Sequence, residues 1–220
     1  MSTKFKVRFF LQGLRPYAQN ECELRNSLWM STFEPEAQNT LFSDPAAVGT
    51  GWANIFKETL SNRAFSTAKE PLDRVIDSFS TLYLHDDILV KVDRASMAHS
   101  LEVRAPFLDK TLTSFIARLP TRMKMKGFKR KLLLKRAMAD SLPRNVLRRP
   151  KKGFGIPLAS WFRGPLRQLA QDTLSRSQLE ERGLFSVEYV QQLLGEHNSR
   201  KFDHRKQLWS LLVFELWRQQ

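Results

Sequence analysis

Apolar residues recur at helical spacing from Pro71 to the end of the chain, and this pattern constrains the fold more than any other feature. Proline, glycine and aspartate mark the borders of successive helical segments. Strand-like alternation is scarce, and its best example, residues 7–10, is weak. The sequence therefore predicts a mostly α fold.

The borders of the first helices follow from these punctuating residues. Pro71 suits the first turn of a helix, which we expect residues 85–87 to interrupt. Asp86 would then cap a second helix. Asp109 is expected to cap a further helix, which ends before Pro120.

The remaining helices have fewer border signals. Short helices are expected to start near Ser31 or Glu34, and at Asp44-Pro45. The last predicted helix is apolar on nearly all sides, so we expect it to be buried or to dock on another domain. The predicted ranges are 129–141, 157–174, 186–198 and 203–217, with a loop over 144–156.

These patterns divide the chain into residues 1–70, which are irregular with short helices, and the helical residues 71–220. A length of 220 residues fits one domain or a large piece of a larger one. Cys22 is the single cysteine and cannot form an internal disulfide, so we expect a cytoplasmic protein. No apolar run approaches the roughly 18 residues of a membrane span, so we expect no membrane partner.

The positive charge is concentrated in one segment. Residues 122–152 contain 13 basic residues and one acidic residue, in a chain with a formal net charge of +14. A phosphate or nucleotide site is the favoured explanation, and a solvated helix face with loops is nearly as good. Nucleic-acid binding is least favoured, because no RNA-recognition, zinc-finger or basic-zipper motif accompanies the cations.

Residues 148–157 within that segment place four cations beside two glycines that flank Phe154. Glycine permits loop conformations that other residues avoid, and lysine suits phosphate oxygens. The pattern is typical of an anion-binding loop, and a solvated basic loop explains it equally well. The histidines lack metal-site spacing, and Cys22 is best explained as a buried, inert thiol.

Residues 86–109 form the most informative block, because charged residues alternate there with apolar anchors. Asp87 and Lys91 are four residues apart and can form an ion pair on a helix. Asp93 and Arg94 must find partners elsewhere. A buried structural salt network is the favoured explanation from position alone.

Several segments together resemble the synthetase domain of glutamine-dependent asparagine synthetases. The resemblance is strong from about residue 71 to residue 217, and the motifs come in the order of that family. They are residues 82–98, 101–109, 131–135, 142–143, 149–154 and 208–217.

The resemblance implies a fold and a reaction. Proteins of this family join an N-terminal glutaminase domain, which releases ammonia from glutamine, to an α/β synthetase domain of the ATP-pyrophosphatase type. The second domain uses ATP and Mg²⁺ to adenylate aspartate, and ammonia then displaces AMP to give asparagine. The chain is similar to the helical C-terminal portion of that synthetase domain. Some relatives amidate other carboxylates, so the acceptor is left open.

The chain departs from the family pattern at three motifs. It has no cysteine at position 2, no Ser-Gly-Gly-x-Asp-Ser pyrophosphate loop and no Gly-Glu-Gly-x-Asp-Glu segment. We expect the glutaminase domain and the ATP-binding segment upstream of residue 1, as partners that the chain lacks. Alone, the chain is expected to be inactive and to bind neither ATP nor Mg²⁺ tightly.

The resemblance also assigns roles to individual residues, none of them a metal ligand. Lys151 matches a catalytic lysine over the adenylate and pyrophosphate, where developing charge needs a positioned cation. Ala95, Val103 and Ala105 match the lining of an ammonia tunnel, whose dry walls disfavour protonation to ammonium. A set of charged residues matches the framework that organises the site, namely Asp93, Arg94, Glu102, Arg104 and Asp109.

A rival hypothesis needs no catalysis. The basic segment and the apolar final helix are also what a stand-alone helical module would use to bind nucleic acid or a partner protein.

Overall fold

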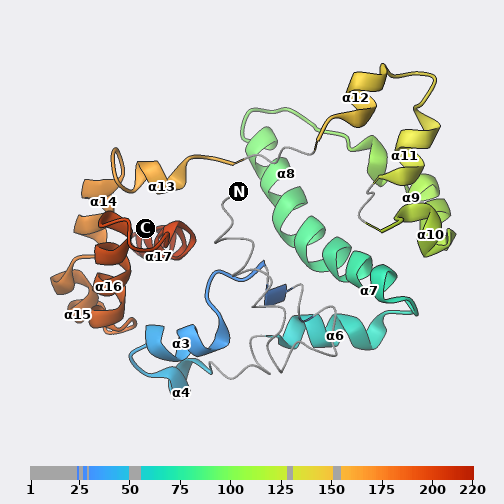
Figure 1. The fold of residues 1–220 in the computed structure, drawn as a ribbon. Helices are drawn as coiled ribbons and strands as arrows, with labels where there is room; N and C mark the ends of the chain where they lie inside the picture. Colours follow the sequence, from blue (N-terminus) through green and yellow to red (C-terminus); the bar gives the residue numbers. More distant parts are fainter. Residues whose placement is uncertain (1–23, 25–26, 29, 50–55, 128–130, 151–154) are drawn as a thin grey trace. The chain divides into compact units, whose positions relative to one another are not determined.

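The structure is a computed structural model, and it describes residues 24, 27–28, 30–49, 56–127, 131–150 and 155–220. The described elements are helices, so the predicted mostly α fold is confirmed (Figure 1). None of the helices within these ranges is long and apolar enough to cross a membrane. The predicted strand at 7–10 and Cys22 lie outside the described residues.

The chain forms two compact units, and each draws on two stretches of sequence. Unit 1 takes residues 1–26 and 58–153, and unit 2 takes residues 27–57 and 154–220. The division into 1–70 and 71–220 stays a prediction.

A continuous helical run dominates unit 1. It joins α7 (Pro71–Ser78), the π-helix η2 (Phe79–Leu89) and α8 (Val90–Met97). The predicted interruption at residues 85–87 is wrong. These side chains are exposed to solvent, and the Asp86 carboxylate contacts the His85 imidazole at 2.5 Å instead of capping a helix. The wider π-helical turn carries the chain past these polar residues without ending the run.

Short helices follow the run. The predicted cap at Asp109 is confirmed, because its carboxylate accepts the Leu112 backbone N–H at 2.9 Å and the helix ends before Pro120. The predicted loop over 144–156 is wrong in its first part, where Pro143 directly precedes a helix. These elements are η3 (Pro106–Leu108), α9 (Lys110–Arg118), α10 (Thr121–Lys124), α11 (Leu132–Ala137) and α12 (Arg144–Arg148), and α6 (Lys57–Phe65) precedes the long run.

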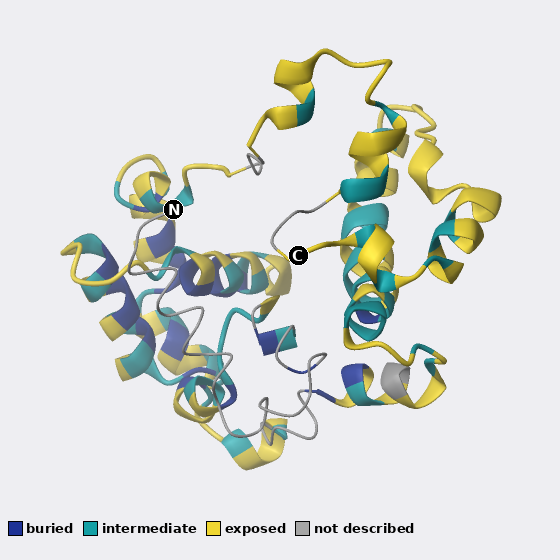
Figure 2. Ribbon diagram, turned by 45° about the vertical axis from the view of Figure 1, so that its right-hand side comes forward, coloured by how far each residue is buried: buried dark blue, intermediate teal, exposed yellow. Residues whose placement is uncertain are grey.

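Unit 2 contains the hydrophobic core among the described residues (Figure 2). Its helices are α3 (Pro35–Leu41), α4 (Pro45–Val48), α13 (Leu158–Trp161), α14 (Arg167–Thr173), α15 (Arg176–Arg182), α16 (Val187–Asn198) and α17 (Arg205–Arg218). Buried side chains from α3, from the end of α13 and from the stretch α14 to α17 meet there, among them Leu41, Phe162, Leu174, Leu179, Val190, Leu208 and Leu212.

Of the helix starts predicted for the first part of unit 2, those near Glu34 and at Asp44 are confirmed, and the alternative start near Ser31 is wrong. Glu34 precedes α3, and the Asp44 carboxylate accepts the backbone N–H groups of Ala46 and Ala47, each at 3.1 Å. The Phe42–Phe185 bridge, with rings 5.5 Å apart, then joins this stretch to the C-terminal one. Both stretches are therefore needed to complete the unit.

The C-terminal stretch differs from the prediction at two points, the break between α13 and α14 and the additional helix α15. The single helix expected over 157–174 is wrong, because turns at residues 162–166 separate α13 from α14, and Pro165 lies in that break. The helix α15 was not expected from periodicity. On α17 one face is buried, whereas Trp209, Val213 and Trp217 on another face are exposed.

Candidate functional site

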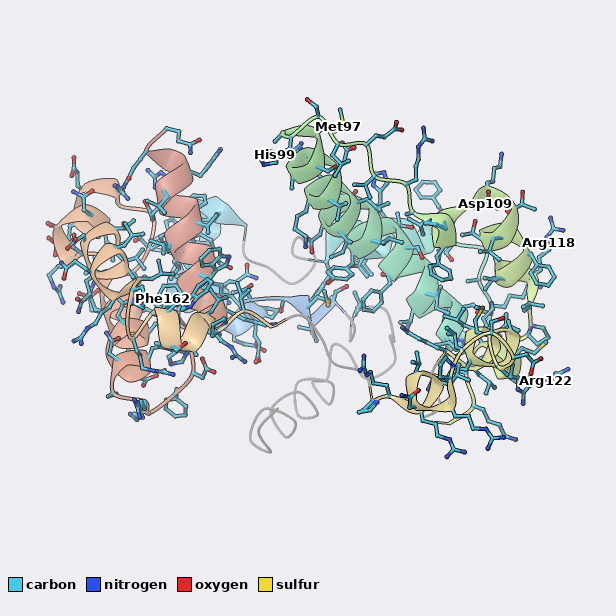
Figure 3. The ribbon with its side chains drawn as sticks, turned by 90° about the horizontal axis from the view of Figure 1, so that it is seen from above. Met97, His99, Asp109, Arg118, Arg122 and Phe162 are labelled. Carbon is cyan, nitrogen blue, oxygen red and sulfur yellow. The ribbon has the colours of Figure 1, made fainter. Side chains whose placement is uncertain are left out.

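The charged residues assigned by resemblance come from two adjoining elements of unit 1. Asp93 and Arg94 lie on α8, and Glu102 and Arg104 lie on the extended segment that follows. All four are exposed. Asp109, which is labelled in Figure 3 and precedes α9, is exposed as well. The buried salt network favoured from position is therefore wrong for this block. These residues could instead face a further segment or a ligand.

Two ion pairs order this block. Lys91 lies 3.8 Å from Asp87 one turn away, as predicted, and Arg104 lies 2.5 Å from Glu102. Both pairs are exposed, so each contributes little to stability. They orient side chains more than they hold the unit together.

The residues assigned to an ammonia tunnel are also exposed. Ala95 lies on α8, and Val103 and Ala105 lie on the extended segment, where 51% of Val103 is accessible to solvent. The described residues do not enclose them in a buried passage. Their role in a tunnel stays a prediction that requires additional walls.

Large apolar side chains accompany this block on the surface. Phe107 is 66% exposed, and Met97, Leu101 and Phe115 each have more than half of their surface exposed. Large exposed apolar side chains of this kind are typical of a surface that another molecule or segment covers. We call the segment from Asp93 to Phe115 the motif surface.

A pocket of about 750 Å³ lies in unit 1 between the segment after α6 and helices α7, α9 and α10. Lys124 bonds to Asp73 at 2.8 Å in its wall, and Lys69 and Asp77 also line it. Sequence analysis missed this pocket. Asp73 and Lys124 are 51 positions apart, and neither belongs to a quoted motif, so no local signal pairs them.

The basic segment is solvent-exposed over its described part. Among the described residues of this segment, Lys124 is the exception. Its side chain is largely buried and forms the one ion pair recorded for the described part of the segment. The remaining cations project into solvent and are free to meet an anion. They are Arg122, Lys126, Lys131, Lys135, Arg136, Arg144, Arg148 and Arg149.

Two predicted features cannot be placed. Lys151 and the loop around Phe154 lie outside the described residues.

Within the described ranges no three His, Cys, Asp or Glu side chains gather where they could hold a metal ion. The described residues therefore do not fit a magnesium site.

Comparison with known proteins identifies the family of the chain. The family model described as "Asparagine synthase" matches residues 8–219. The chain belongs to the asparagine synthase family. This confirms the family indicated by the motifs of residues 82–109. The helical structure also agrees with a fragment of an asparagine synthase domain.

Three relatives show how far the similarity extends. The chain is 40% identical over 157 residues to the Mycobacterium bovis protein named "Putative asparagine synthetase (glutamine-hydrolyzing)", covering 70% of this chain and 24% of that protein. It is 34% identical over 135 residues to asparagine synthetase (glutamine-hydrolyzing) 1 of Bacillus subtilis, covering 61% of this chain and 21% of that protein. For asparagine synthetase (glutamine-hydrolyzing) of Gallus gallus the identity is 41% over 88 residues, covering 37% and 15%.

The chain spans about a quarter or less of the length of these relatives. No solved structure matches it.

Proposed function

We propose that the chain supplies the helical portion of a synthetase domain that amidates a carboxylate at the expense of ATP, with aspartate as the acceptor. The carboxylate attacks the α-phosphate and releases pyrophosphate. Ammonia derived from glutamine then attacks the acyl carbon and releases AMP. The ATP-binding segment and the glutaminase domain come from another part of the enzyme or from a partner chain.

The observation that carries this proposal is the family match over residues 8–219. The motif surface supports it, because the residues that match the family's charged framework are exposed and accompanied by apolar side chains. Such charged residues can orient reacting groups once a second segment covers them, because charge interactions are stronger where water is excluded.

In this proposal Lys151 places its ammonium group over the adenylate and pyrophosphate. A positioned cation stabilises charge that builds on phosphate oxygens in the transition state. Ala95, Val103 and Ala105 line the path of ammonia once the covering segment is present. Magnesium would be held by the covering segment. The assembled enzyme is placed in the cytoplasm.

A segment exchange tests the proposal. The 157-residue segment of the Mycobacterium bovis relative that matches this chain is replaced by the corresponding residues of this chain. We expect the chimera to release pyrophosphate from ATP when aspartate is added, and to form asparagine with ammonium as the nitrogen source. A folded chimera that binds ATP but shows no aspartate-dependent release contradicts the proposal.

One observation favours a second candidate, a stand-alone basic module that binds nucleic acid or another partner. Eight cations of the basic segment are exposed, although the comparisons provide no support for this function. Binding of the 220-residue chain to random-sequence RNA, measured over a salt series, tests the nucleic-acid version. Phosphate contacts make such binding fall steeply with salt, so no binding at low salt rejects it.

A further inference from the structure

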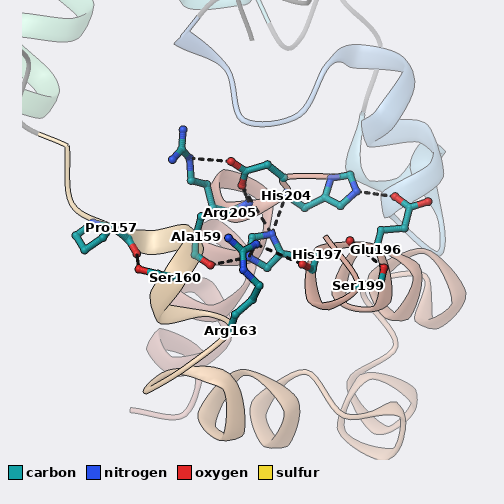
Figure 4. Close-up of polar contacts among 10 residues, drawn as sticks. Pro157, Ala159, Ser160, Arg163, Glu196, His197, Ser199, His204 and Arg205 are labelled. Carbon is teal, nitrogen blue, oxygen red and sulfur yellow. Dashed lines mark hydrogen bonds and ion pairs between the residues drawn. The ribbon is translucent and has the colours of Figure 1, made fainter. Parts of the chain in front are cut away.

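A buried histidine joins three segments of unit 2, none of which contributes to the candidate site. His197 lies in the last turn of α16 with no exposed surface. Its Nδ1 accepts the backbone N–H of His204 at 3.1 Å, and its Nε2 lies 3.2 Å from the carbonyl oxygen of Ala159 (Figure 4). The side chain therefore connects α16 to the start of α17 and to α13.

These contacts define the protonation state of the ring. A backbone amide can only donate, so Nδ1 of His197 must carry the lone pair. Nε2 then carries the hydrogen and donates it to the Ala159 carbonyl. Both ring nitrogens are satisfied in this neutral tautomer, and a second proton has no place at Nδ1.

Three charged or titratable groups face the ring. The Arg163 guanidinium lies 3.3 Å from Nε2 and 3.4 Å from the His197 carbonyl oxygen, to which it donates. Asp203 lies 3.8 Å from Nδ1, but it is half exposed and already accepts the Arg205 backbone N–H. His204 is the third.

The His204 ring is itself engaged by a carboxylate. It contacts Glu196 at 2.6 Å, and Lys201 lies 3.7 Å from the same carboxylate group. His204 and Lys201 thus use the charge of Glu196, which leaves Asp203 as the anion that faces the His197 ring.

Protonation of His197 would set two N–H groups against each other across the 3.1 Å contact with His204. It would also bury a positive charge beside Arg163, at a cost that Asp203 offsets only in part. Accordingly, burial is the main cause that lowers the pKa of His197 below its ordinary value of 6.5, and Arg163 adds to this.

We propose that His197 is an acid-sensitive latch. It holds residues 199–204 and α13 against α16 while its imidazole is neutral, and it releases them when the imidazole takes up a proton. The latch belongs to unit 2 and stands independently of the proposed synthetase function.

Amide hydrogen exchange of the full chain between about pH 7 and pH 5 tests the latch, after correction for the intrinsic pH dependence of exchange. Below pH 6.5 we expect protection of the His204 amide to fall by up to about tenfold per pH unit, because the opened state binds the proton. Protection of Leu193 in the middle of α16 should change much less, since the opening is local.

Two variants identify the residue responsible. His197→Gln keeps one acceptor and one donor in the side chain but cannot titrate, so protection of the His204 amide should no longer respond to pH. His204→Gln keeps the backbone amide and should retain the response. An unchanged response in His197→Gln, or its loss in His204→Gln only, overturns the proposal.

A measurement on the unmodified chain covers the case in which His197→Gln does not fold. NMR titration of the His197 ring should show a neutral imidazole in the closed state at pH 6. A ring that titrates at 6.5 while the His204 amide stays protected contradicts the latch.

Discussion

The ammonium group of Lys124 lies 2.8 Å from the Asp73 carboxylate and links α10 to α7 across 51 positions of sequence. The Lys124 side chain is 11% exposed and that of Asp73 is 25% exposed. Lys124 also donates to the Ala117 carbonyl at 3.0 Å, and the Thr121 hydroxyl lies 3.4 Å from Asp73. This small network fixes one wall of the pocket in unit 1.

Removal of Lys124 should therefore destabilise unit 1. Lys124→Met leaves a largely buried carboxylate without its cation, and we expect a loss of about 1–3 kcal/mol. Urea unfolding monitored at unit 1 measures this loss. The exposed Lys126→Met serves as the control and should change stability by less than about 0.5 kcal/mol. Equal effects of the two variants would contradict the role of the ion pair.

A second buried ion pair lies in unit 2, where Arg182 of α15 contacts the fully buried Glu215 of α17. Arg218 also pairs with this carboxylate, but at the longer distance of 3.8 Å. We expect Arg182→Ala to cost up to about 3–5 kcal/mol, since it leaves a buried charge that Arg218 compensates only in part.

The double variant Arg182→Met with Glu215→Leu is the matched comparison for that pair. It removes both charges, so it should be markedly more stable than Arg182→Ala. Thermal unfolding of the three proteins measures the difference. A double variant no more stable than Arg182→Ala would show that packing, and not charge, dominates at this site.

Acid should destabilise unit 2 in two stages. The folded state lowers the pKa of His197, chiefly by burial. The neutral imidazole therefore contributes fully to the stability of unit 2 above pH 6.5, and this contribution is lost as the pH falls below that value. The His204 hydrogen bond is the main cause that lowers the pKa of Glu196, so its contribution is lost only below 4.5. Urea midpoints over a pH series measure both stages. His197→Gln should remove the first stage alone. Glu196→Gln should reduce the second stage, to which the lowered pKa of Glu188 also contributes.

In an assembled enzyme, Lys151→Ala should depress adenylation far more than glutaminase turnover. A transition-state contact of this kind typically accounts for about 10²–10³ in rate. Pyrophosphate release and glutamate formation, measured on the same chimera, separate the two activities. Lys152→Ala is the control and should have a much smaller effect. Equal loss of both activities in Lys151→Ala would remove this lysine from the chemistry.

Local signals in the sequence predicted the parts of the fold that local interactions decide. Asp109 and Asp44 each bond to backbone amides within three residues, so spacing alone identifies them as helix starts. The interruption predicted at residues 85–87 was wrong for a physical reason. Exposed polar residues tolerate a helix, and packing of Phe79 against Tyr83 supports one.

The candidate site could be predicted only in part. Motifs indicated which residues share a block, and the family match confirms the family. Sequence spacing could not predict that Asp93 and Glu102 would be exposed, since burial depends on what packs against them. The pairing of Asp73 with Lys124, and of His197 with Ala159, depends on tertiary contacts that no local pattern records.

The interleaved construction of unit 2 has a consequence for its folding kinetics. The hydroxyl of Ser210 meets that of Thr32, 178 residues away, and α3 packs beside α16. Such distant pairing slows folding, because the chain must close a long loop before these contacts form. During synthesis, α3 emerges from the ribosome well before α16 and α17. Until they arrive its apolar side has no native partner, so nascent chains should depend on chaperones for longer than those of a unit built from one continuous stretch.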